Sequence, residues 1–178
     1  SGCDWSSDVC SSDLEMLGNF SFGDYFKREA CEWALEFMIE VLGFEKERLF
    51  FTIYKEDDET KDIWLELGIE EKYIYKFGDE DNWWGPAGDE GPCGPCSELH
   101  YYQGDKKNMH FDDPKWGPNL HDDFIELYNL VFTQFYRDIE GNDKPLPFNN
   151  IDTGMGLERT VSVLNNQETA YNTDIFRS

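Results

Sequence analysis

The feature that most restricts the fold is a long alternating segment that reverses direction near the end of the chain. Residues 125–136 (IELYNLVFTQFY) alternate with the period of two that is typical of a β-strand. This period places Leu127, Asn129, Val131 and Thr133 on one face and residues 126, 128, 130 and 132 on the other. A turn sequence at residues 140–143 (EGND) then returns the chain as an antiparallel partner. Two long strands joined in this way predict a mainly antiparallel sheet.

The returning segment ends in a glycine-rich corner with the composition of a ligand site. Residues 149–159 (NNIDTGMGLER) run from an apolar strand through Gly154 and Gly156 into a helix. Glycines let a nucleotide approach the backbone, and a helix N-terminus attracts anions. Arg159 could fork onto phosphate oxygens, and Asp152 could hold an ammonium group. Taken alone, the same residues also fit an ordinary turn followed by a solvated helix face.

The first half of the chain predicts a scaffold of strands and helices. Residues 26–42 carry apolar side chains at helical spacing, and Gly43 is a suitable stop. Residues 58–67 predict a short acidic helix. The predicted strands are residues 15–22, 49–54, 73–77 and 97–102. Because the strands are joined by hairpins and the helices are segregated, we expect an α+β domain.

Two segments predict irregular structure. Residues 78–95 are rich in glycine and proline and read as a long loop. Residues 103–123 are polar and read as a surface insertion, in which His110 and His121 have no local partner. A zinc site would need further ligands at suitable spacing, so we predict no protein-bound metal.

The tetrapeptide Cys93-Gly94-Pro95-Cys96 has two interpretations. It is a redox pair where it opens a helix whose dipole lowers the pKa of a thiol. Here it enters the strand predicted for residues 97–102, so that activation is missing. We therefore expect structural thiols, and a thiol oxidoreductase is the less favoured alternative.

Five segments, taken in order, are together far more specific than any one of them. They are EMLGNFSFGDYFK (15–27), DNWWGPAGDEGPCGPCSE (81–98), ELYNLVF (126–132), PLP (145–147) and IDTGMGLER (151–159). All five resemble the alanyl-tRNA synthetase family of class II aminoacyl-tRNA synthetases, and the last resembles its motif 3. The resemblance implies a class II catalytic core, in which an antiparallel sheet flanked by helices binds ATP and an amino acid side by side.

The resemblance also implies a role for individual residues. Asp152 and Gly154 would bind alanine, with Asp152 on its α-ammonium group. Trp84 would form one wall of the alanine pocket, and Asn129 and Val131 would complete it. Arg159 would be the catalytic residue that holds the γ-phosphate of ATP, with Gly156 beside it. Glu98 is a candidate contact to ATP or to Mg²⁺. Such chemistry depends on orientation and charge neutralisation more than on an acid or base.

Parts of the family's pattern are not found in the sequence. Motif 1, the first strand of motif 2 and its phosphate-clamping arginine would precede residue 15, and Leu14 stands where the family stacks a phenylalanine on adenine. Residues 4–14 resemble the translation of a common sequencing adapter, so we expect residues 1–14 to be non-native. We expect residues 15–178 to run from the second strand of motif 2 through motif 3, as a fragment that is inactive by itself.

Composition restricts the partners. Fifteen basic and 38 acidic residues give a formal net charge of −23, which argues against a broad nucleic-acid-binding face. The resemblance implies alanine and ATP as partners, with the acceptor end of tRNA(Ala) bound by the full-length enzyme. No leader or membrane-spanning run is evident, so we expect a cytoplasmic protein without a membrane partner. A non-catalytic ligand-binding module is the alternative from another class.

Overall fold

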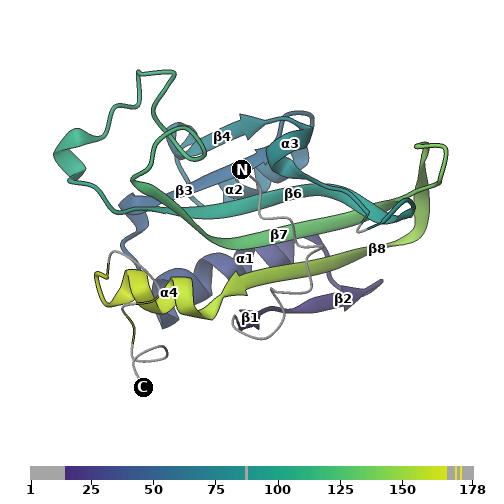
Figure 1. Cartoon of the computed structure of the whole chain (residues 1–178), viewed down its shortest axis with the longest axis horizontal. Helices are drawn as coiled ribbons and strands as arrows, with labels where there is room; N and C mark the ends of the chain where they lie inside the picture. The colour runs from purple at the N-terminus through teal and green to yellow at the C-terminus, as the bar shows by residue number, and fades with distance from the viewer. Residues whose placement is uncertain (1–14, 87, 168–170, 172, 174–178) are drawn as a thin grey trace.

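A sheet of eight strands organises the chain (Figure 1). The structure is a computed structural model that describes residues 15–86, 88–167, 171 and 173. The strand order is β1-β8-β7-β6-β3-β4, with β2 also paired to β8 and β5 to β6. The strands are β1 (Met16–Leu17), β2 (Phe20–Phe22), β3 (Leu49–Tyr54), β4 (Ile74–Phe77), β5 (Trp83–Trp84), β6 (Gly91–Tyr102), β7 (Phe124–Arg137) and β8 (Asp143–Gly156).

The pairing confirms the predicted α+β class with a mainly antiparallel sheet. Every pair of strands is antiparallel except β3 and β4. These two strands run parallel to each other, and the chain that connects them contains a helix. The predicted long hairpin is formed by β7 and β8, and Gly141 adopts a φ of 83° in the turn between them. Such a φ favours glycine over other residues. The helices are α1 (Lys27–Glu36), α2 (Asp58–Glu66), α3 (Asp79–Asn82) and α4 (Leu157–Leu164).

The long helix predicted for residues 26–42 ends in a wider last turn. α1 is followed by one π-helical turn, Phe37–Val41, and Gly43 then adopts a φ of 74° as the expected stop. The predicted acidic helix is α2, which begins after Asp57. The Asp57 carboxylate accepts a hydrogen bond from the backbone nitrogen of Thr60 at 3.2 Å, and this caps the helix.

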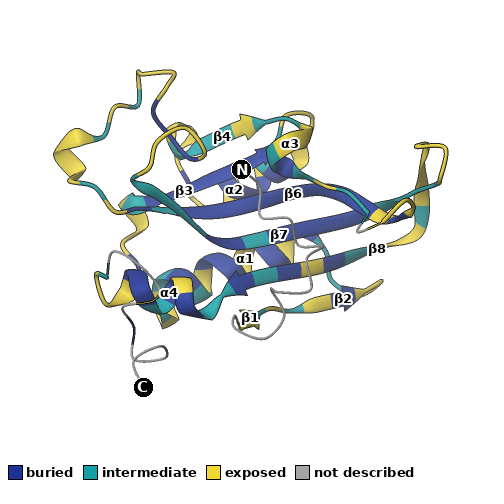
Figure 2. Cartoon of the chain, viewed as in Figure 1, coloured by how far each residue is buried: buried dark blue, intermediate teal, exposed yellow. Residues whose placement is uncertain are grey.

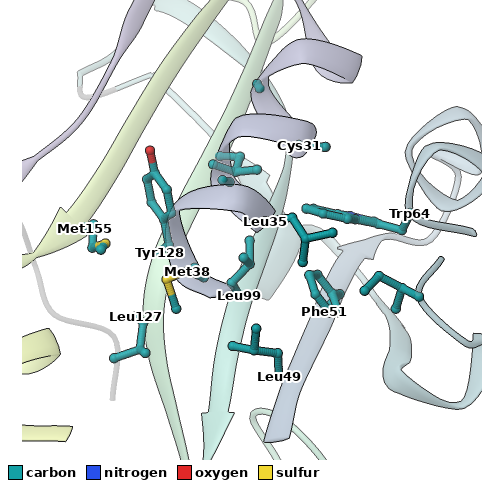
Figure 3. Packing of buried hydrophobic residues seen from close by; sticks show 14 of the residues in the cluster. Cys31, Leu35, Met38, Leu49, Phe51, Trp64, Leu99, Leu127, Tyr128 and Met155 are labelled. Carbon is teal, nitrogen blue, oxygen red and sulfur yellow. The ribbon is translucent and has the colours of Figure 1, made fainter. Parts of the chain in front are cut away.

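The hydrophobic core lies between one face of the sheet and the helices α1 and α2 (Figure 3). Leu35 and Met38 face Leu99 and Phe51 of the sheet, and the rings of Phe51 and Trp64 are 4.5 Å apart. Each fully buried side chain of this size contributes about 1.5–3 kcal/mol. Burial extends along most of β3 and β6 and through the middle of β7, whereas the far end of the β7–β8 hairpin is exposed (Figure 2). The opposite face of the sheet is therefore available for a polar site.

The prediction of one continuous loop over residues 78–95 is wrong. This segment contains α3, β5 and the start of β6, and the cysteine tetrapeptide lies inside β6. Prolines lack an amide hydrogen and normally argue against a strand. Here the proline-bearing part of β6 is flanked by β7 on one side and only by the two residues of β5 on the other. Few ladder hydrogen bonds are lost, so the strand tolerates Pro92 and Pro95.

The predicted insertion at residues 103–123 has a packing role. Its regular structure is one short 3₁₀ turn, Lys106–Asn108, but Trp116 is buried against Phe50 and Tyr102 in a second aromatic cluster. The prediction that His121 lacks a local partner is wrong, since its Nδ1 lies 3.7 Å from a carboxylate oxygen of Asp123. The insertion therefore covers one end of the sheet.

At the start of β7, the side chains of residues 126 and 127 lie on the faces of the sheet opposite to those predicted. Tyr128 pairs with Leu99 and Glu126 pairs with His100, so Leu127 is an extra residue in a β-bulge. Leu127 joins the core with Tyr128, whereas a continuous alternation had placed the two on different faces. The bulge also brings Glu126 onto the face that carries Asn129.

Candidate functional site

Strand pairing brings several of the predicted site residues onto one face of the sheet. Val131 of β7 is opposite Asp152 of β8, and Asn129 is opposite Gly154. On the other side of β7, Asn129 is opposite Glu98 of β6. Directly opposed residues in an antiparallel pair have Cβ atoms about 4.5–5.5 Å apart. These residues, separated by up to about a third of the sequence, therefore form one continuous patch.

Trp84 belongs to β5, which pairs with β6 on the other side from β7. β5 pairs Trp84 with Gly94, two residues before Cys96, whose partner on β7 is Val131. Trp84 is 41% exposed, whereas its neighbour Trp83 stacks on Phe135 at 5.8 Å. Trp83 is thus part of the packing, and Trp84 remains available to a ligand.

A buried hydrogen-bond network surrounds Glu98. Its Oε2 atom accepts a hydrogen bond from the Thr52 hydroxyl at 3.0 Å and lies 2.9 Å from Nε2 of His100. A carboxylate only accepts, so Nε2 is the donor in that contact. Asn82 donates to the Thr52 hydroxyl at 2.8 Å. All four residues are at most 7% exposed, so the network is shielded from water.

Asn129 joins this network through only one end of its amide. Its Nδ2 atom donates to Oε1 of Glu98 at 3.4 Å. Its Oδ1 atom is buried and has no hydrogen-bond partner among the described residues. A buried polar atom without a partner costs about 1–3 kcal/mol. An unsatisfied acceptor at this position is a feature that a donating ligand would relieve.

The carboxylate of Asp152 lies on the exposed surface of β8. The surrounding sheet desolvates it and raises its pKa above the ordinary value. No lysine, arginine or histidine of the described residues forms an ion pair with it. Asp152 lies four residues before the N-cap of α4, which is Gly156, so it does not cap that helix. A bound cation would lower its pKa again.

Arg159 is held at the start of α4 by Glu126. Its Nη1 atom donates to the Glu126 carbonyl oxygen at 2.8 Å and lies 3.6 Å from the carboxylate. Burial and the nearby Glu98 raise the pKa of the Glu126 carboxyl, while His100 and Arg159 oppose that shift. Arg159 is exposed and keeps other donors for an anion.

The two glycines of the corner differ in what surrounds them. A Cβ at Gly154 would lie 2.7 Å from the terminal methyl of Met16, which therefore covers this position. A Cβ at Gly156 would make only an ordinary contact of 3.5 Å with Arg159. A Cβ at residue 154 would have to displace only this flexible methyl group. The helix α4 begins directly after Gly156 as predicted.

The cysteine pair has the properties of buried thiols. Burial and Asp143 raise the pKa of Cys93 to about 11, and burial raises that of Cys96 as well. Both are free thiols inside a strand. A redox-active pair has a lowered pKa instead.

Sequence reasoning missed several residues of this face: Met16, Thr52, Asn82, His100 and Glu126. Two of them carried a signal. Thr52 is a polar residue within the apolar strand LFFTIY. His100 is two residues after Glu98 in a predicted strand, so the two side chains share a face. Glu126 could not be found because the bulge reverses its face.

The described residues of this face do not form a metal centre by themselves. Within residues 15–86 and 88–167, no group of three or more potential ligands could hold a metal ion by itself. A separate hollow of about 440 Å³ is lined by Arg48, Tyr101, Gln103 and Val163 among others, and contains none of the predicted site residues. No described helix is long and apolar enough to cross a bilayer.

Comparison with known proteins shows the family of this chain. Residues 13–178 match the family model described as tRNA synthetases class II (A). The chain is 48% identical over 166 residues to an alanine–tRNA ligase of Petrotoga mobilis, covering 92% of this chain and 19% of that protein. It is 46% identical over 174 residues to that of Rubrobacter xylanophilus, covering 92% and 20%. The chain thus spans about a fifth of the length of these relatives, and it belongs to the class II tRNA synthetases.

Proposed function

We propose that this chain is the amino-acid-activating part of an alanine–tRNA ligase. It binds alanine and ATP with Mg²⁺, and within the whole enzyme it forms alanyl-adenylate for transfer to tRNA(Ala). The observation that carries the proposal is the strand register, which groups Asp152 and Gly154 with Val131 and Asn129. A role in protein synthesis places the enzyme in the cytoplasm.

The amino acid would lie along β7 and β8. Asp152 has an accessible carboxylate that forms no ion pair with any residue the structure describes, and an ammonium group would supply a cation. Val131 and Trp84 would limit the volume for the side chain, and Gly154 would leave space beside it. Because the methyl group of Met16 lies over Gly154, it would move when the amino acid enters.

ATP would lie toward α4. Arg159 would hold the γ-phosphate, with Gly156 and the N-terminus of α4 beside it. The face also carries Asp81, Glu98 and Glu126, and the pKa values of Asp81 and Glu126 are raised by burial and by Glu98. When ionised, these carboxylates would repel the triphosphate, and their oxygens are the ligands that a hard divalent cation prefers.

Mg²⁺ is commonly held by one or two carboxylates together with substrate phosphates. Glu126 fits this better than Glu98, whose oxygens already lie within hydrogen-bonding distance of three side chains. When bound, the ion would neutralise charge on the phosphates. The role of Glu98 as a contact to ATP or Mg²⁺ stays a prediction.

The reaction needs alignment more than proton transfer. A carboxylate oxygen of alanine attacks the α-phosphorus, the bond from that phosphorus to the bridging oxygen breaks, and pyrophosphate leaves. A hydroxyl at the 3′ end of tRNA then takes the acyl group, and AMP leaves. Asp152 would anchor the amino acid and Arg159 the triphosphate, so that the two reacting atoms face each other.

The two alternatives are less well supported. A thiol oxidoreductase would need a lowered thiol pKa, and those of Cys93 and Cys96 are raised. A non-catalytic ligand-binding module would share the binding face, and only catalysis by the whole enzyme separates it from a ligase.

Calorimetric titration of the chain with sulfamoyl analogues of aminoacyl-adenylates tests the proposal. The alanyl analogue should bind, and the leucyl analogue should bind much more weakly because its side chain does not fit beside Val131 and Trp84. Val131→Gly should reduce this difference. No binding of the alanyl analogue, or equal binding of both by the unmutated chain, would refute the proposal.

A further inference from the structure

We propose that Thr52, Asn82, Glu98 and His100 form a positioning network that fixes the orientation of the Asn129 amide for the α-ammonium group of the bound amino acid. The proposal rests on the function proposed above, since it assigns a role to residues behind the amino-acid site. None of the four needs to touch the substrate.

The first step concerns the direction of the Asn129 amide. An ionised carboxylate offers only acceptors, so the amino end of the amide must face Oε1 of Glu98. The carbonyl oxygen Oδ1 then points away from Glu98 and has no partner among the described residues. It is left as an acceptor.

The second step concerns what holds Glu98. Thr52 and His100 both contact Oε2, at 3.0 and 2.9 Å, which leaves Oε1 for Asn129. Asn82 holds the Thr52 hydroxyl by donating to it at 2.8 Å, so that the hydroxyl hydrogen is directed to Glu98. Thr52 and Asn82 are completely buried, and His100 is 2% exposed. Such side chains act on a ligand only through others.

The third step concerns the ligand group. Asn129 is opposite Gly154, and Asp152 is two residues along β8 on the same face, within reach of a shared ligand. An ammonium group has three donors, and it can use the Asp152 carboxylate and the Asn129 carbonyl together. This pairing satisfies the buried Oδ1 atom and the Asp152 carboxylate at once. The network therefore acts on the ammonium group and not on the nucleotide.

The experiment compares Thr52→Val with Thr52→Ser, which keeps the hydroxyl. Thr60→Val is the matched control, because Thr60 is equally buried and its hydroxyl donates to Asp57 at 2.7 Å, outside the network. Two ligands are titrated: the alanyl sulfamoyl-adenylate analogue and its propionyl counterpart, which lacks the amino group. His100→Phe is the second network variant in case Thr52→Val does not fold.

Thr52→Val and His100→Phe should weaken the alanyl analogue about tenfold, the effect of one lost hydrogen bond to a charged group. They should leave the propionyl analogue unchanged. Thr52→Ser and Thr60→Val should bind both ligands as the unmutated chain does. Equal weakening of both ligands in the network variants would overturn the proposal, because it would indicate a general structural effect.

A second readout does not depend on ligand affinity. The side-chain amide resonances of Asn129, assigned by their loss in Asn129→Asp, should shift and exchange faster in Thr52→Val than in the unmutated chain. Unchanged resonances would overturn the network. Failure of the unmutated chain to bind either analogue would instead overturn the proposed function and, with it, the role of the network toward the ammonium group.

Discussion

Replacing Lys27 by methionine should strongly destabilise the protein, because it removes the cation from a buried ion pair. Lys27 of α1 is 4% exposed, and its Nζ atom lies 2.7 Å from Oδ1 of Asp57. The side chain of Asp57 is 5% exposed and caps α2. The second contact of Lys27, to Glu59 at 2.9 Å, involves a carboxylate that is 65% exposed and contributes little. The interaction at stake is therefore that between Lys27 and Asp57, which also joins the two helices.

The expected cost is about 3 kcal/mol. Breaking a buried pair by removing one partner costs about 3–5 kcal/mol, because the other charge stays buried without compensation. The low end applies because Asp57 keeps its hydrogen bonds from the backbone nitrogen and the hydroxyl of Thr60. For a chain of this size each kcal/mol shifts Tm by about 2–4 °C, so Tm should fall by about 6–12 °C.

Urea denaturation followed by circular dichroism measures the effect, with Lys61→Met as control. Lys61 of α2 pairs with Glu71, whose carboxylate is 73% exposed, so this variant should change the midpoint little. Adding Asp57→Asn to Lys27→Met should recover most of the loss, because asparagine is neutral and still caps a helix. A Lys27→Met variant as stable as the unmutated protein, or no recovery in the double variant, would refute the reasoning.

Three further predictions follow from the site. Cys93 should react slowly with iodoacetamide at pH 7, and the rate should rise toward pH 11, because its thiol pKa is raised to about 11; rapid alkylation at pH 7 would contradict this. Gly94→Ala should unfold at a lower urea concentration than Gly154→Ala, because a Cβ at residue 94 would lie 2.0 Å from a backbone carbonyl oxygen, whereas one at residue 154 meets a movable methyl group; equal midpoints would show the clash to be unimportant. Asp152→Asn should weaken the alanyl analogue at least tenfold and spare the propionyl analogue. In the unmutated chain, the alanyl analogue should lower the raised pKa of Asp152 in an NMR titration, because an ammonium group favours the ionised carboxylate.

The sequence predicted the elements whose pattern is local. The strand Leu49–Tyr54 and the helix α2 have the predicted positions within one residue, because apolar periodicity and an acidic first turn determine them. The β7–β8 hairpin was likewise evident from alternation and a turn sequence. Errors arose where the structure depends on a neighbour. The prolines of β6 are tolerated because that part of the strand has little pairing on one side, and no local signal reports this.

The site was predicted as a set of residues but not as a network. Resemblance to the family predicted Asp152, Asn129 and Trp84, and the strand register brings Asp152 and Asn129 onto one face. The roles of the three residues stay predictions. The residues that support them could not be inferred from the sequence. Thr52 contacts Glu98 and Asn82 contacts Thr52, but the spacing of these three residues in the sequence does not indicate that they meet in the fold. The bulge at Leu127 has the same character, because one extra residue reverses a face without changing the composition of the strand.

The pairing of β1 and β2 with β8 has a consequence for how the protein is made. The backbone nitrogen of Asn19 binds the hydroxyl of Thr153, 134 residues later, and the Glu15 carbonyl accepts from the nitrogen of Leu157. At about 5–20 residues per second, a ribosome needs about 7–27 s to supply those partners. Until then β1 and β2 are bare edges, and Phe20 and Phe22, 59% and 83% exposed even in the finished fold, are open to other chains. Chaperone capture and aggregation during synthesis should therefore involve the segment of β1 and β2.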